Sequence, residues 1–157
     1  MGRIYRDWGK YEEAIGHYQQ SQEIYQHLGQ EKNVANSWFW MALCYEKWGK
    51  YEEALDAAQQ NLALCQQLDD LPTIAHAYSQ LGQIYQDWGK HQEAIAHHQQ
   101  SRELYQQLGK EKNVANSWLW MALCYEKWGK YEEALDAAQQ DLALRQQLDY
   151  LPNIAIA

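Results

Sequence analysis

Residues 38–55, "WFWMALCYEKWGKYEEAL", contain the end of one helix, a turn and the start of another helix. In the first part, large and apolar side chains recur at i, i+3, i+4, i+7 and i+10, the spacing of one helix face: Trp38, Met41, Ala42, Tyr45 and Trp48. Gly49 follows, and glycine readily adopts the left-handed conformation that ends a helix. Glu52 and Glu53 lie in the first turn of the second helix, where the helix dipole favours negative charge. The stretch predicts an antiparallel helical hairpin.

The hairpin is repeated along the chain. Trp-Gly-Lys recurs at 8–10, 48–50, 88–90 and 128–130, a constant step of 40 residues. Over a longer period of 80, residues 31–69 and 111–149 differ only at Phe39/Leu119, Asn61/Asp141 and Cys65/Arg145. We therefore expect an array of these units: 1–32, which lacks the first half of its first helix, then 33–72, 73–112, 113–152, and 153–157 as the opening of a further first helix. Pro72 and Pro152 suit the first turn of a helix.

The residue order also carries a family resemblance. Along one unit it runs Tyr78, Leu81, Gly82, Tyr85, Ala94 and Ser101, which resembles the tetratricopeptide repeat. Units 33–72 and 113–152 match as well, except that Asn61 or Asp141 occupies the last small position. The usual repeat has about 34 residues, and the 40-residue form is similar to that of kinesin light chains, G-protein-signalling modulators and many bacterial arrays. The resemblance implies an all-α solenoid of antiparallel helix pairs, wound as a right-handed superhelix, that serves as a binding scaffold.

Composition and charge exclude several classes of partner. The formal net charge is −8, whereas a nucleic-acid-binding protein needs a basic surface. The sequence has no apolar run of the roughly 18 residues that would span a bilayer, no basic amphipathic segment and no signal-peptide pattern. The three cysteines show neither metal nor disulfide spacing and indicate a reducing, cytoplasmic compartment. We expect a protein or peptide partner, not nucleic acid or a membrane.

Candidate catalytic and metal-binding groups have simpler explanations. The Glu-Glu pairs at 12–13, 52–53 and 132–133 recur with the repeat, so they are interpreted as charged first turns. His91 and His98 are seven residues apart, too far for one metal ion without other ligands, and tyrosines replace both in the first unit. Cys44 and Cys124 lie on the packing side of a helix. The sequence predicts no enzyme activity, no cofactor and no metal site.

The resemblance implies that the first helices line a concave groove. The groove positions of unit 73–112, here called a polar unit, include His76, Ser79, Gln80 and Gln83. Those of the two units 33–72 and 113–152, here called aromatic units, are Asn36, Phe39, Trp40, Leu43 and Lys47, and Asn116, Leu119, Trp120, Leu123 and Lys127. Phe39 with Trp40, and Leu119 with Trp120, form two aromatic ridges. Three roles remain possible for these ridges: core packing between first helices, a clamp for a hydrophobic peptide or helix, or self-association. In the clamp, His76, Gln80 and Gln83 set the register.

The two ends of the sequence suggest an assembly. Residues 1–10 correspond to 81–90, and "LPNIAIA" at 151–157 corresponds to "LPTIAHA" at 71–77. Placed tail to head, they nearly rebuild one first helix. The alternative function is therefore a self-assembling module, a homo-oligomer joined head to tail or by swapping. The residues of this joint are Arg3, Ile4, Tyr5, Tyr150, Ile154 and Ile156. An excised or engineered piece of a longer array is the competing explanation.

Overall fold

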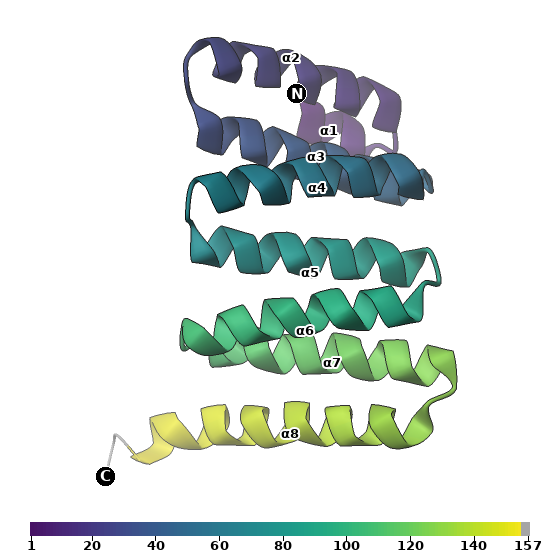
Figure 1. Ribbon diagram of the computed structural model, residues 1–157, viewed down its shortest axis with the longest axis vertical. Coiled ribbons are helices and arrows are strands. Elements are labelled where there is room, and N and C mark those ends of the chain that lie inside the picture. The colour runs from purple at the N-terminus through teal and green to yellow at the C-terminus, as the bar shows by residue number, and fades with distance from the viewer. Residues whose placement is uncertain (155–157) are drawn as a thin grey trace.

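The computed structural model describes the backbone of residues 1–154 and the side chains of residues 1–149. Within this part of the chain all regular structure is helical, which confirms the expected fold class. The helices are α1 (Gly2–Asp7), α2 (Tyr11–His27), α3 (Glu31–Trp48), α4 (Tyr51–Gln67), α5 (Leu71–Asp87), α6 (His91–Gln107), α7 (Glu111–Trp128) and α8 (Tyr131–Ile154). Successive helices are antiparallel and stack in one column from α2 to α8 (Figure 1).

The turns within and between hairpins use the left-handed backbone region. Gly49 ends α3 with φ 78° and Gly129 ends α7 with φ 81°, as the sequence predicted. Between α4 and α5 the same region is occupied by Asp69, with φ 51°, where units 1–32 and 73–112 have Gly29 and Gly109. These tight turns reverse the chain between successive helices.

Small side chains form the centre of each hairpin. Ala14, Ala54 and Ala94 are completely buried at equivalent places in α2, α4 and α6. Because alanine adds little bulk, the paired helices approach closely, and Met41 and Leu81 fill the space between units. Cys44 and Cys124 are also completely buried, which confirms their assignment to the packing side.

The tryptophans of the Trp-Gly-Lys turns differ from the expected buried stripe. Trp48 is 39% exposed, and Trp8 and Trp128 are exposed as well. In every turn the lysine that follows places its ammonium group over the tryptophan ring, at 3.5–4.0 Å from the centroid. The left-handed glycine between them folds the lysine back over the ring, so the tryptophan is covered by a charged side chain rather than by the core.

The end of the array also differs from expectation. The sequence predicted a new helix opening at Pro152, but α8 continues without a break to Ile154. At the interior equivalent, the Asp70 carboxylate accepts a hydrogen bond from the Thr73 amide, 3.4 Å, and caps α5. Tyr150 replaces this aspartate in the last unit. Without a carboxylate to cap a new helix, the old one continues.

Candidate binding groove

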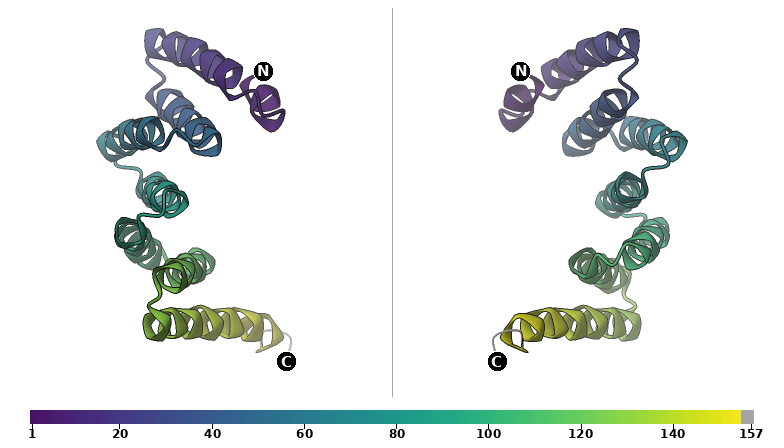
Figure 2. Two further views of the ribbon diagram at one scale, coloured as in Figure 1. Left: turned by 90° about the vertical axis from the view of Figure 1, so that its right-hand side faces the viewer. Right: turned by 90° about the vertical axis from the view of Figure 1, so that its left-hand side faces the viewer.

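The array curves, and its first helices lie on the inner side of the curve. Figure 2 shows α3, α5 and α7 along the open side, with α4 and α6 behind them and both termini toward the opening. The helices that carry the predicted groove residues therefore lie on the inner side of the curve. That inner side is referred to below as the groove.

The groove deepens into a pocket between α3, α4 and α5. Its volume is about 420 Å³, enough for one large side chain and part of its backbone. The wall combines aromatic rings with polar groups: Lys32, Ala35, Asn36, Phe39, Trp40, Asn61, Cys65, Leu68, Asp70, Thr73 and His76. Four of the predicted groove residues (Asn36, Phe39, Trp40 and His76) therefore share one pocket. The sequence did not predict the α4 wall.

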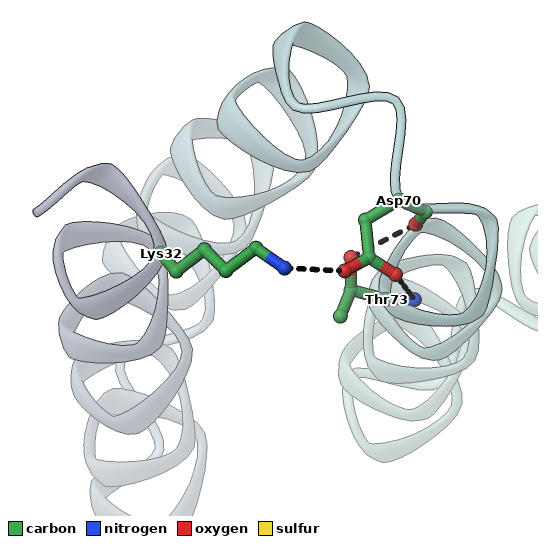
Figure 3. A network of polar contacts seen from close by, with 3 residues as sticks. All are labelled: Lys32, Asp70 and Thr73. Atoms are coloured by element: carbon green, nitrogen blue, oxygen red, sulfur yellow. Dashed lines mark hydrogen bonds and ion pairs between the residues drawn. The ribbon is translucent and has the colours of Figure 1, made fainter.

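A polar network links the pocket's α3 and α5 walls (Figure 3). The Lys32 ammonium lies 3.3 Å from the Asp70 carboxylate, which comes from the opposite wall. The Asp70 carboxylate also accepts from the Thr73 amide, and the Thr73 hydroxyl donates to the Asp70 carbonyl, 2.9 Å. The Lys32 side chain is largely exposed, so this ion pair can open at low energetic cost.

The aromatic ridge of the first aromatic unit is neither free nor fully buried. Phe39 and Trp40 contact each other edge to face, 5.0 Å between centroids, and both are half-buried. Phe39 also contacts His76 at 4.9 Å. Trp40 stacks on Tyr18 of α2 at 6.4 Å, and the Arg6 guanidinium lies 4.8 Å from its ring. Each ring is fixed by packing while part of it remains in the groove.

The second aromatic unit presents a different surface. Trp120 stacks on His98 of α6 at 6.4 Å, in the way that Trp40 stacks on Tyr18. Leu119 is exposed where Phe39 is half-buried. Beside it, Arg145 of α8 donates to the Asn116 side-chain oxygen, 3.0 Å, and to Asp141, 2.7 Å. Asn116 is thus occupied by the protein's own guanidinium.

Some of the predicted polar groove residues of α5 make hydrogen bonds within the protein. Gln80 is buried, and its amide nitrogen donates to the Phe39 carbonyl, 2.9 Å, so its amide group links α5 to α3. Gln83 donates to the Asp87 carboxylate, 3.0 Å. His76 is exposed and Ser79 is half-buried. We therefore keep His76 and Gln83 as register-setting candidates and assign Gln80 a structural role.

The remaining predicted groove residues lie toward the other end of the first helices. Lys47 bridges two carboxylates, Glu46 at 2.6 Å and Asp87 at 3.7 Å. Lys127, its equivalent in α7, is exposed, and Leu43 and Leu123 are half-buried. The carboxylates beside Lys47 compete for its charge, so this part of the groove is poorly suited to an acidic ligand.

The predicted joint residues are only partly described. Arg3 and Ile4 are exposed, and Tyr5 stacks on His17 at 5.0 Å. The side chains of Tyr150 and Ile154, and residue Ile156 as a whole, lie outside the described part of the chain.

The histidines and cysteines are embedded in packing. His98 is 1% exposed, and burial lowers its pKa to about 4. His97 stacks between Tyr78 and Tyr85 of α5. Among the side chains of residues 1–149, no three histidine, cysteine or acidic groups come together as a metal site would require. Burial raises the pKa of Cys44 and Cys124 to about 11, so both thiols stay protonated at neutral pH.

The described helices include none with the length and apolar character needed to cross a membrane. A family model for the tetratricopeptide repeat matches residues 33–107 and again 73–147, and a second model of that description matches residues 1–31. No curated protein sequence matches the chain.

Several solved structures share the fold. BtubC (BKLC) from P. vanneervenii superposes with a TM-score of 0.83 at 20% identity, covering 94% of this chain and 61% of that one. Aspartyl phosphate phosphatase F from Bacillus subtilis gives 0.85 at 17% identity, covering 96% and 40%. A Rap protein complexed with competence and sporulation factor gives 0.81 at 18% identity, covering 94% and 42%. The chain thus spans about two-fifths to three-fifths of these proteins.

Proposed function

Because this chain belongs to the tetratricopeptide repeat family, we propose that its groove binds an extended or helical segment of a protein partner. The fold is that of a protein–protein interaction module, and its geometry offers binding surface rather than reactive groups. The partner segment runs along α3, α5 and α7. Its main anchor enters the pocket between α3, α4 and α5.

The observation that carries this proposal is the pocket beside Phe39 and Trp40. Half-buried aromatic rings that are already held in place lose little entropy on binding, and such rings are typical of binding hot spots. Asn36, exposed at the same pocket, offers an amide that can bond a peptide backbone. Leu119 and Trp120 extend the apolar surface to the second aromatic unit. His76 and Gln83 lie between the two and set the register.

The Rap protein of similar fold was solved as a complex with competence and sporulation factor. At 18% identity this neighbour establishes the shared fold alone, so the inference for our chain rests on its own pocket.

The experiment is a selection from a random dodecapeptide display library against the whole chain, followed by NMR mapping of a selected peptide. The proposal expects shifts at Asn36, Phe39 and His76, and loss of these shifts in Phe39→Ala. Peptides that map away from this pocket and from the inner side of α3, α5 and α7, or that bind Phe39→Ala equally well, would contradict it.

A second candidate function is self-association through α2. Ile24 and Leu28 are 59% and 62% exposed, whereas their equivalents Leu104 and Leu108 are half-buried beneath α5. A hollow of about 500 Å³ continues from Ile24 to Trp40. Exposed apolar surface of this kind usually marks a contact site.

The contact between α5 and α6 shows which kind of segment could cover the exposed face of α2. Ser101 of α6 donates to the Ala75 carbonyl of α5, 2.8 Å, and is completely buried. Its equivalent, Ser21, instead donates to the His17 carbonyl of its own helix, 2.9 Å. We propose that residues 151–157 of a second copy, which resemble 71–77, cover α2 as α5 covers α6. Arg3, Ile4 and Tyr5 then flank the joint.

Light scattering coupled to size exclusion tests this candidate, with the whole chain compared with a chain lacking residues 151–157. Association that depends on concentration and is lost in the shortened chain and in Ile24→Glu supports it. Ala63→Glu, on the outer helix α4, is the matched control. A monomer at every concentration would contradict it.

A further inference from the structure

The two aromatic units differ at four positions, Phe39/Leu119, Asn61/Asp141, Cys65/Arg145 and Asp70/Tyr150, and all four residues of the first unit line one pocket. Phe39, Asn61 and Cys65 come from two helices, yet each lines the cavity of about 420 Å³. Elsewhere residues 31–69 and 111–149 are identical. The duplicated units therefore diverge at the pocket wall alone.

In the second aromatic unit, an arginine of the protein itself occupies the place equivalent to this pocket. Arg145 replaces Cys65, and its guanidinium bonds Asn116, the equivalent of Asn36. Asp141 replaces Asn61 and accepts from Arg145 Nε at 2.7 Å. A guanidinium thus lies between the two side-chain oxygens that correspond to those of Asn36 and Asn61. In the first unit, the shorter Cys65 contacts only the Asn61 side, where its thiol donates weakly to Asn61 Oδ1 at 3.5 Å, and an entering guanidinium would replace this bond.

The first pocket has the chemistry to hold a guanidinium from outside. The side-chain oxygens of Asn36 and Asn61 are acceptors, and the Asp70 carboxylate is a third acceptor in the wall. Guanidinium groups also stack on aromatic faces. This chain already uses that contact twice, with Arg6 over Trp40 at 4.8 Å and Arg102 over Trp118 at 4.2 Å. The net charge of −8 favours a basic partner.

We infer that the pocket between α3, α4 and α5 binds an arginine side chain of the partner segment, and that Arg145 fills the equivalent place of the second aromatic unit in cis. This inference rests on the proposed function and specifies the anchor residue of the ligand. The guanidinium bonds Asn36 and Asn61, and the methylene stem packs on Phe39. As it enters, it competes with Lys32 for the Asp70 carboxylate.

The test is an NMR titration of the ¹⁵N-labelled whole chain with four blocked tripeptides, acetyl-Gly-X-Gly-amide, in which X is Arg, Lys, Phe or Leu. The arginine peptide is expected to shift Asn36, Phe39 and Asn61, and to bind about tenfold more tightly than the lysine peptide, because only arginine bonds in a planar fork. The lysine peptide controls for general attraction to an acidic protein.

Matched variants locate the site. Asn36→Ala removes one acceptor and is expected to weaken the arginine peptide about tenfold, whereas Asn116→Ala in the second unit leaves its affinity unchanged. Cys65→Arg places the second unit's arginine in the first and is expected to abolish binding. Arg145→Cys is its control and leaves binding at the first pocket unchanged.

The outcomes separate this inference from the proposed function. Preference for the phenylalanine or leucine peptide at these residues would overturn the arginine assignment and leave a groove that binds an apolar anchor. Arginine binding that Asn36→Ala does not weaken, or no binding of any tripeptide, would also overturn the assignment. The dodecapeptide selection tests the groove independently of these tripeptides.

Discussion

Gly82 lies directly against the ring of His98, and a Cβ atom added to this glycine would come within 2.7 Å of the imidazole. The same relationship holds between Gly2 and Tyr18, at 2.9 Å. In units 1–32 and 73–112, a glycine on the first helix leaves room for a ring from the second helix. That ring then stacks on Trp40 or Trp120 of the next unit. Gly2 and Gly82 thus leave room for Tyr18 and His98, and these two rings support Trp40 and Trp120.

We expect Gly82→Ala to lower the free energy of unfolding by about 1–3 kcal/mol, because the His98 ring is buried and has no space to move. Gly16→Ala is the matched control. Gly16 is also helical but has no atom near its Cβ position, so alanine there should stabilise by about 0.5–1 kcal/mol. Urea denaturation measures both. Equal effects of the two substitutions would contradict the close packing of His98.

His98 should make the protein sensitive to acid. Burial lowers its pKa from 6.5 to about 4, so between these values the unfolded state binds a proton that the folded state does not. Stability is therefore fully present above pH 6.5 and falls as the pH drops toward 4, by roughly 3 kcal/mol from this residue.

Replacing His98 by tyrosine, the residue at the equivalent position 18, tests whether His98 causes the acid sensitivity. His98→Tyr keeps a ring against Gly82 and removes the titrating group, so its melting temperature should fall less between pH 7 and pH 4.5 than that of the wild type. Parallel melting curves would assign the acid sensitivity to other residues.

Glu46 should oppose stability at neutral pH. It is 4% exposed, and burial raises the pKa of its carboxyl despite the neighbouring Lys47 ammonium; Asp87 acts in the same direction as burial. A raised pKa in the folded state means that its stability contribution is present at low pH and is lost as the pH rises through that pKa.

We therefore expect Glu46→Gln to raise the melting temperature at pH 7, with a gain that shrinks as the pH falls toward 4.5 and is absent below it. Glu126→Gln changes the equivalent, exposed residue of α7 and should have little effect. A lower melting temperature for Glu46→Gln at pH 7 would show that its ion pair with Lys47 outweighs the cost of burial.

The sequence was sufficient to predict the hairpins because their signals are local. The helical spacing from Trp38 to Tyr45 and the left-handed Gly49 involve residues close together in one unit. Trp48 was misassigned because its cover, Lys50, lies beyond the helix end, although the constant Trp-Gly-Lys spacing carried that signal.

The pocket could not be predicted because its wall comes from three helices. Lys32, Cys65 and Asp70 meet only when neighbouring hairpins stack in register. The available signal was the divergence of two otherwise identical units at Phe39, Asn61, Cys65 and Asp70. The continuation of α8 was missed for a related reason: the helix break depends on the Asp70 cap, and Tyr150 removes it.

The account depends most on the groove as a binding surface, and the affinity of a selected dodecapeptide for Trp40→Ala tests this directly. Isothermal titration should show binding at least about tenfold weaker than for the wild type, with the far-ultraviolet circular dichroism of the protein retained. Trp128→Ala, at the exposed end of α7, should bind like the wild type. Unchanged affinity in Trp40→Ala would contradict the groove as the binding site, and loss of the helical signal would assign Trp40 to the core.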